Sequence, residues 1–329
     1  MASVYEARDR ISGGVVALKV MHTGDDWRIE HFEREAALLA GLDHPGIVRH
    51  VAHGRAGDGQ LYLVMEWLEG QTLAERLRRG PLPASDTVEL AAQVAEALGA
   101  AHAAGVVHRD IKPSNLFLCG DGVDRVKILD FGVARFGAGQ ARTLTGVTVG
   151  TPGYMAPEQA RGARELDGRA DLFSLGCVLY ECLCGKPAFA GEHVMAVLAK
   201  ILLAEIPSLA ETVADVPPVV EELLARLLAK DPDGRPVDAP SVAAQLRGVD
   251  LSAPVQPRDW ARGSGAVLTS GEQQLLAVVM AGGPTSAGAE GATAPTLWAA
   301  NVPETLEAVR QAVSALGGHL EQLVGGALV

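Results

Sequence analysis

The most informative part of this sequence is His108-Arg109-Asp110-Ile111-Lys112-Pro113-Ser114-Asn115, with Asp130-Phe131-Gly132 downstream of it. The two motifs place a carboxylate, an amide and a second carboxylate in a fixed order along the chain. Carboxylate and amide oxygens are the ligands that Mg²⁺ prefers in proteins. A polar loop followed by an unrelated turn rarely combines these residues by accident, so we treat both motifs as parts of one site.

The chemistry that requires these three groups together is phosphoryl transfer from ATP. Asp110 is the candidate to accept a hydroxyl proton, Asn115 to hold Mg²⁺ on its amide oxygen, and Asp130 to bridge Mg²⁺ to the phosphates. Catalysis of this kind is mostly positioning and charge neutralisation. Asp110 therefore needs to orient the hydroxyl rather than to act as a strong base.

Length and composition narrow the class of protein. The 329 residues predict a large unit plus a smaller one, and the net charge of -12 argues against nucleic acid as a partner, which would require a basic face. No basic leader and no apolar run long enough to span a bilayer is present in this sequence. The cysteines are too few for a disulfide framework or a zinc site, so we expect reduced thiols and a cytoplasmic location: Cys119, Cys177, Cys182 and Cys184.

Hydrophobic periodicity predicts strands first and helices later. Ser3–Val20 alternates around Gly13-Gly14 as a hairpin does, and Trp27–Leu42 has helical spacing. Ile47–His53 and Gln60–Trp67 are further strand candidates. Later helices are predicted at Thr87–Ala103, Leu172–Cys184, Val194–Leu203, Val219–Leu228 and Ser241–Leu246.

This order predicts an α+β fold with two lobes and the motifs at their junction, where ligand sites are common. The N-lobe spans about residues 1–67 and the C-lobe about 68–247. Residues 248–270 are rich in Ser, Pro, Gly and Ala and are predicted to form a linker. Residues 271–329 then form a small α/β segment.

Lys19 of Val16-Ala17-Leu18-Lys19, then Glu35, and then the two motifs occur in an order that resembles eukaryotic-type Ser/Thr protein kinases of bacteria, over residues 1–247. The resemblance implies that Lys19 contacts the α and β phosphates of ATP and pairs with Glu35. Glu30 and Glu33 are rivals of Glu35. The alignment through the helix favours Glu35.

The resemblance also implies an adenine site. Val4 and Ala17 are expected above the ring and Phe117 below it. Met65 is expected beside the ring as the gatekeeper. The hinge backbone of Glu66 and Leu68 is expected to bind the edge of the ring.

Further residues take family roles in catalysis and structure. Lys112, two residues after Asp110, balances charge on the γ-phosphate and favours Ser or Thr as the acceptor. Glu158 is expected to form a buried ion pair with Arg235. Asp171 is expected to tie the catalytic loop to the large helix behind it.

Arg109 before the catalytic aspartate implies activation by phosphorylation of the segment after Asp130. A phosphothreonine would carry about -1.5 to -2 charges and could draw three cations together, His31, Arg109 and Arg135. The candidate acceptors are Thr145 first, then Thr143 and Thr148.

Two departures from the family pattern concern the beginning and the tail. Ala2 and Val4 align with the end of the glycine-rich phosphate loop, whose first glycines and strand are absent from this sequence. We weighed a start codon placed too late against a non-catalytic kinase-like scaffold. The first is favoured because Lys19, Glu35 and the motif residues all remain.

In the tail, Leu275–Met280, Pro303–Leu316 and Leu320–Val329 read as strand, helix and strand, which resembles part of a class III nucleotidyl cyclase domain. Ala281-Gly282 and Gly325-Gly326 stand where that family needs metal-binding aspartates. We therefore expect a non-catalytic interaction or regulatory module.

Overall fold

The computed structural model of the chain describes residues 2–21, 32–33, 36–57, 59–131, 152–163, 165–191, 193–205, 209, 213 and 216–251. All of them belong to the first of two compact units, Met1–Gly139 with Val149–Val255. The second unit is Gln140–Thr148 with Gln256–Val329. The predicted tail module, most of the predicted linker, Thr143, Thr145 and Thr148 lie outside the described residues.

The N-lobe is built on a four-stranded antiparallel sheet in the order β1-β2-β4-β3. The predicted hairpin is confirmed as β1 (Ala2–Arg8) and β2 (Val15–Met21), with Gly13 at a φ of 73° in the turn, a value that glycine adopts without strain. β3 is His50–Arg55 and β4 is Leu61–Glu66. β1 stands at an edge of this sheet.

A helix covers the face of the sheet that carries Leu61, Leu63 and Met65. Residues 32–33 and 36–40 of the predicted helix are helical, and Phe32 and Ala36 are buried against these three β4 side chains. The alternation of buried and half-buried residues along β4 follows from this one-sided cover. Glu35 lies outside the described residues.

The C-lobe is helical and is organised around α3 (Ala84–Ala103) and α5 (Arg169–Cys184). Small residues such as Ala and Gly let the helices approach closely, and nearly all of α5 is buried. α3 packs against α5 and α8. The remaining helices are α2 (Leu73–Leu77), α4 (Pro157–Ala160), α6 (Val194–Leu203), α7 (Pro218–Leu227) and α8 (Ala239–Arg247).

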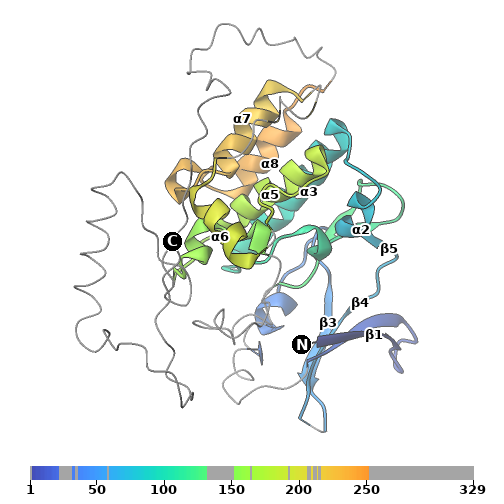
Figure 1. The fold of residues 1–329 in the computed structure, drawn as a ribbon. Helices are drawn as coiled ribbons and strands as arrows, with labels where there is room; N and C mark the ends of the chain where they lie inside the picture. Colours follow the sequence, from blue (N-terminus) through green and yellow to red (C-terminus); the bar gives the residue numbers. More distant parts are fainter. Residues whose placement is uncertain are drawn as a thin grey trace, which may run out of the picture. The chain divides into compact units, whose positions relative to one another are not determined.

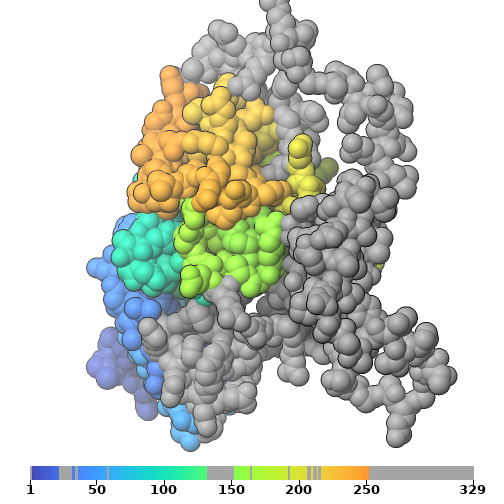
Figure 2. Space-filling model, turned by 90° about the vertical axis from the view of Figure 1, so that its left-hand side faces the viewer, coloured from blue at the N-terminus to red at the C-terminus, as the bar shows by residue number. Residues whose placement is uncertain are grey.

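Figure 1 shows this arrangement, with the blue strands at one end of the first unit and the green to orange helices at the other. Figure 2 shows the C-lobe helices as one continuous packed surface from teal to orange. The fold is therefore α+β and bilobal, as predicted. No helix within the described ranges combines the length and apolar character that crossing a membrane requires.

A small sheet carries the residues between the lobes. It consists of β5 (Gly70–Thr72), β6 (Leu116–Cys119) and β7 (Val126–Ile128) in that order. Ile47 of the N-lobe forms a parallel bridge with Ile128. This bridge holds the segment leading to β3 beside β7, and β7 leads directly to Asp130.

Element boundaries differ from the prediction in a few places. α3 begins three residues before the predicted Thr87, with Pro83 at its N-cap and Asp86 in its first turn, where a negative charge stabilises a helix. β3 runs over His50–Arg55 and therefore begins and ends later than the predicted strand. None of the four cysteines, all of which lie in the described residues, forms a disulfide; Cys177 and Cys182 are buried and the other two half-buried.

Candidate active site

The loop 108–115 holds Asp110 between two side chains that bind its carboxylate. Lys112 Nζ lies 2.8 Å from Asp110 Oδ2. Asn115 Nδ2 donates to the same oxygen at 3.1 Å and to the Asp110 carbonyl at 2.8 Å. A 3₁₀ turn, Pro113–Asn115, places the amide there. Because the nitrogen is used by Asp110, the amide oxygen is the atom of Asn115 that can bind a cation.

Asp171 anchors this loop from α5. Its fully buried carboxylate accepts hydrogen bonds from the backbone N–H of His108 at 2.8 Å and of Arg109 at 2.7 Å. His102 Nε2 lies 2.9 Å from the same carboxylate. As the sequence predicted, Asp171 ties the loop to the large helix, and without it buried N–H groups would lose their acceptors.

His108 is fully buried, and both of its ring nitrogens have partners. Nε2 donates to the carbonyl of Leu129 at 2.8 Å, and Nδ1 accepts from the N–H of Asp110 at 3.2 Å. One donor and one acceptor describe a neutral imidazole. Burial lowers the pKa of His108, which favours the same neutral form. The ring packs on Phe131 with centroids 4.8 Å apart.

Two residues of the site have strained backbones. Within the described ranges, Arg109 and Asp130 are the non-glycine residues with positive φ, 65° and 52°. Such conformations cost about 1–3 kcal/mol each and persist only where the surroundings enforce them. The N–H of Leu129, just before Asp130, donates to the Asn115 carbonyl at 2.8 Å, so the two motifs are joined through backbone.

Lys19 and Asp130 meet across the lobes. Lys19 Nζ on β2 lies 2.6 Å from Asp130 Oδ1, and the Asp130 side chain is 40% exposed. The sequence predicted Glu35 as the partner of Lys19; that residue lies outside the described ranges, so its pairing stays a prediction. A cation and a carboxylate expected to handle phosphate and metal are thus already adjacent.

Behind this ion pair lies a small cavity of about 20 Å³, room for about one water molecule. Met65, the predicted gatekeeper, is in its wall. The wall consists of Lys19, Met21, Leu39, Val48, His50, Leu63, Met65, Asp130 and Phe131. Ala17 pairs with Met65, and Val4 pairs with Lys19 on the same sheet face. Val4 is 59% exposed, as a residue that covers a ligand would be.

Two of the remaining predicted adenine contacts, Glu66 and Phe117, are neighbours of Lys127 of β7. Glu66 Oε1 accepts from Lys127 Nζ at 2.6 Å and from the N–H of Arg49 at 2.7 Å. Phe117 pairs with Lys127 and is half-buried, and Leu68 is half-buried in the segment after β4. The Glu66 side chain is thus engaged in structure, and its backbone N–H donates to the Arg49 carbonyl at 3.0 Å.

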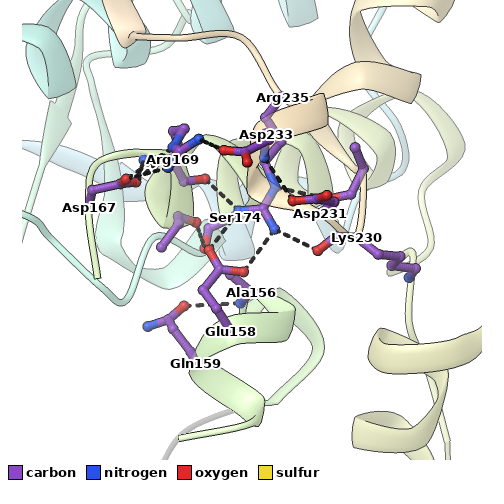
Figure 3. Close-up of polar contacts among 12 residues, drawn as sticks. Ala156, Glu158, Gln159, Asp167, Arg169, Ser174, Lys230, Asp231, Asp233 and Arg235 are labelled. Atoms are coloured by element: carbon purple, nitrogen blue, oxygen red, sulfur yellow. Dashed lines mark hydrogen bonds and ion pairs between the residues drawn. The ribbon is translucent and has the colours of Figure 1, made fainter. Parts of the chain in front are cut away.

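Glu158 and Arg235 form the buried ion pair that the sequence predicted. Arg235 Nη1 and Nη2 donate to Glu158 Oε1 and Oε2 at 2.7 and 2.8 Å. The Arg235 side chain is fully buried and also donates to the carbonyls of Ala229, Arg169 and Lys230. Figure 3 shows Glu158 pointing from α4 into this cluster. The pair fastens α4 to the turn before α8.

The protein kinase domain family matches residues 1–245 of the chain. The chain belongs to this family. It is 38% identical to the serine/threonine-protein kinase pkn3 of Myxococcus xanthus over 76% of this chain and 48% of that protein. It is 38% identical to PknL of Mycobacterium tuberculosis (strain ATCC 25618 / H37Rv) over 75% of this chain and 62% of that protein.

A further relative is PrkC of Bacillus subtilis, 37% identical over 75% of this chain and 38% of that protein. The chain thus spans about half the length of the curated relatives it matches. These relatives are bacterial serine/threonine kinases by name. The family and its two-lobed fold follow from the matches, and the activity of the present chain is taken up below.

Two residues of this kinase site were missed by sequence reasoning. Gln159 donates from Nε2 to the carbonyl of Arg109 at 3.1 Å. His50 lines the cavity, and its Nε2 is hydrogen-bonded to His53 Nδ1 at 2.9 Å. Burial is the main cause of the lowered pKa of His50. Neither residue has a sequence signal of its own. Gln159 can be found only from the tertiary structure, by asking which side chain donates to the Arg109 carbonyl.

Proposed function

We propose that the chain transfers the γ-phosphate of ATP to serine or threonine hydroxyls of proteins. The observation that carries the proposal is the Asp110 carboxylate held at 2.8 and 3.1 Å by Lys112 and Asn115. A carboxylate fixed in this way can orient a hydroxyl for attack. The names of the curated relatives support serine and threonine as acceptors.

The nucleotide would bind between the lobes. Lys19 supplies a cation for the α and β phosphates, and Glu35 is its proposed partner in the active arrangement. The adenine ring would lie under Val4 and Ala17. The other proposed contacts are Phe117 below the ring, Met65 at its side, and the backbone of Glu66 and Leu68.

Asn115 and Asp130 would hold the Mg²⁺ that accompanies ATP. Their oxygen atoms fit, because Mg²⁺ prefers amide and carboxylate oxygens. Asn115 Nδ2 donates to Asp110, so the amide oxygen is the atom of Asn115 that would bind the cation. Within the described ranges, no group of three or more His, Cys, Asp or Glu side chains is arranged to hold a metal ion. Bound Mg²⁺ would neutralise phosphate charge, and Lys112 would add to this at the γ-phosphate.

We propose protein substrates as partners and the chain itself as one of them. Thr145 is the first proposed acceptor, with Thr143 and Thr148 as alternatives; all three lie outside the described residues. The residues 271–329 are proposed to form a non-catalytic module. Resemblance to the family supports phosphorylation of proteins and of the chain itself. The glycines at the positions of the metal-binding aspartates support a non-catalytic tail.

The test is transfer of radiolabel from ATP to a serine- and threonine-containing acceptor, with the chain and with Asp110→Asn. We expect the variant to lose at least about two orders of magnitude in rate, since a positioned proton acceptor contributes that much or more. Phosphoamino-acid analysis should find phosphoserine or phosphothreonine, and mapping of the labelled chain should find the activation-segment threonines.

Equal labelling by the chain and by Asp110→Asn would remove the kinase proposal and leave a non-catalytic kinase-like scaffold. Arg247→Met is a matched control, because Arg247 pairs with Glu89 and Glu96 on the C-lobe surface. It should label the acceptor as the unaltered chain does.

A further inference from the structure

The peptide bond that precedes the catalytic aspartate belongs to a strained residue. Arg109 has a φ of 65°, in a region that non-glycine residues seldom occupy. Asp110 follows directly, so rotation at Arg109 would swing its carboxylate away from Lys112 and Asn115. Something must therefore hold both polar groups of the Arg109 backbone.

Two side chains from different elements hold these groups. The N–H of Arg109 donates to Asp171 Oδ1 at 2.7 Å, and its carbonyl accepts from Gln159 Nε2 at 3.1 Å. Asp171 comes from α5 and Gln159 from α4. The carbonyl is that of the Arg109–Asp110 peptide, so Gln159 acts on the plane to which Asp110 is attached.

The other end of the Gln159 amide is also used. Its Oε1 accepts from the N–H of Ala156 at 3.0 Å, at the start of α4. With one N–H donor and one carbonyl acceptor as partners, the amide has only one orientation that satisfies both. α4 itself is fastened by Glu158, the neighbour of Gln159, to Arg235. Any shift of α4 is thus passed to the Arg109 carbonyl.

We propose that Gln159 is a positioning residue of the kinase site, which couples the place of α4 to the orientation of Asp110. It touches no substrate and acts through the Arg109 carbonyl. The inference rests on the proposed phosphotransfer for its kinetic consequence. Its structural consequence, a loop 108–112 held in one conformation by α4, can be measured without any catalysis.

Gln159→Glu is the decisive variant. Its carboxylate can still accept from the Ala156 N–H, but above its pKa it has no hydrogen to donate to the Arg109 carbonyl. Burial and the facing carbonyl raise the pKa of such a carboxyl, so acid restores the donor. At pH 8 we expect kcat to fall about tenfold with the KM for ATP little changed. The ratio of variant to unaltered kcat should rise at least about threefold between pH 8 and pH 6.

Gln93→Glu is the matched control. Gln93 makes the same two kinds of bond elsewhere, from Nε2 to the Val123 carbonyl at 3.0 Å and to Oε1 from the Val126 N–H at 3.1 Å. Its Nε2 also donates to Glu89 Oε1 at 2.8 Å, so Gln93→Glu should lose at least as much stability as Gln159→Glu, whereas the pH-dependent recovery of kcat should be absent. Gln159→Met, which cannot regain a donor, should stay impaired at both pH values.

Amide hydrogen exchange of residues 108–112 completes the test. Exchange should be faster in Gln159→Glu and Gln159→Met at pH 8 and unchanged in Gln93→Glu. A kcat ratio independent of pH, or unaltered exchange in both Gln159 variants, would overturn the inference. If the unaltered chain transfers no phosphate, the proposed function fails, and the exchange comparison alone then decides whether Gln159 holds the loop.

Discussion

At the residue scale, the site depends on buried polar groups whose every bond is used. Asp171 takes two backbone N–H groups of the catalytic loop, and His108 uses one nitrogen as donor and the other as acceptor. Removing either side chain would leave partners buried without a bond, which costs more than the bond contributes when made. The position of Asp110 therefore follows from its neighbours rather than from its own side chain.

His108 should make the kinase domain sensitive to acid. Burial lowers its pKa in the folded state, while the unfolded state keeps the ordinary value near 6.5. Below about pH 6.5 the unfolded state binds a proton that the folded state does not, so stability falls as the pH falls. In His108→Phe this component should vanish, and the loss of unfolding free energy between pH 7.5 and 5.5 should shrink by about 1 kcal/mol.

Urea unfolding at the two pH values measures this difference. His50, whose pKa is also lowered, contributes equally to both proteins and cancels in the comparison. An identical pH dependence in the unaltered chain and in His108→Phe would show that the folded imidazole takes up its proton over the same pH range as the unfolded one, contrary to its burial and its two bonds.

At the element scale, short segments are placed by contacts with distant ones. α4 is held by Glu158 and Arg235, and Gln159 of the same helix reaches the catalytic loop. β7 is held to the N-lobe by the Ile128 bridge and by Lys127 on Glu66. A helix as short as α4 has too few intrahelical bonds to be stable alone, so its position comes from packing.

Breaking the Glu158–Arg235 pair should destabilise the C-lobe strongly. Glu158→Ala leaves a fully buried guanidinium with carbonyl partners only, and we expect a loss of about 3 kcal/mol, near the lower end for a broken buried pair. Arg247→Met removes two exposed ion pairs on the same lobe, with Glu89 and Glu96, and should cost about 1 kcal/mol or less. Urea midpoints of the two variants test the contrast, and equal losses would contradict it.

At the scale of the whole molecule, the two lobes face each other at a small cavity. One wall comes from β2 and β4 of the N-lobe, and another from Asp130 and Phe131, which follow β7. The core of the C-lobe closes with α8, whose Val242 and Leu246 are buried as it packs on α3. Among the described residues, α8 is the last element of the C-lobe, and it ends at Arg247.

A chain that ends after Val255, the last residue of the first unit, should therefore fold and work as the full chain does. We expect its free energy of unfolding, measured in urea, to agree with that of the full chain within about 0.5 kcal/mol, because changes away from a core have effects of that size. The phosphotransfer rate should also be unchanged. A clearly less stable or inactive truncated chain would show that residues beyond 255 support the kinase domain.

The sequence alone determined the family and the bilobal α+β fold, and it predicted the catalytic residues. The reason is that Asp110, Asn115 and Asp130 lie in short motifs that can be read directly from the sequence. The buried residues of α3 also recur at helical spacing, which marks it as a helix. α2 was missed although Thr72 and Glu75 form a capping box, a readable signal that its short length concealed.

Only the tertiary structure decided how these residues are held. The Lys19–Asp130 pair, the Glu66–Lys127 pair and the Gln159 bond to Arg109 each join residues far apart along the chain. Periodicity reports which face of an element is buried, but not which distant donor meets a given carbonyl. The strain at Arg109 and Asp130 was equally hidden, because φ there is imposed by the packed surroundings rather than preferred by either residue.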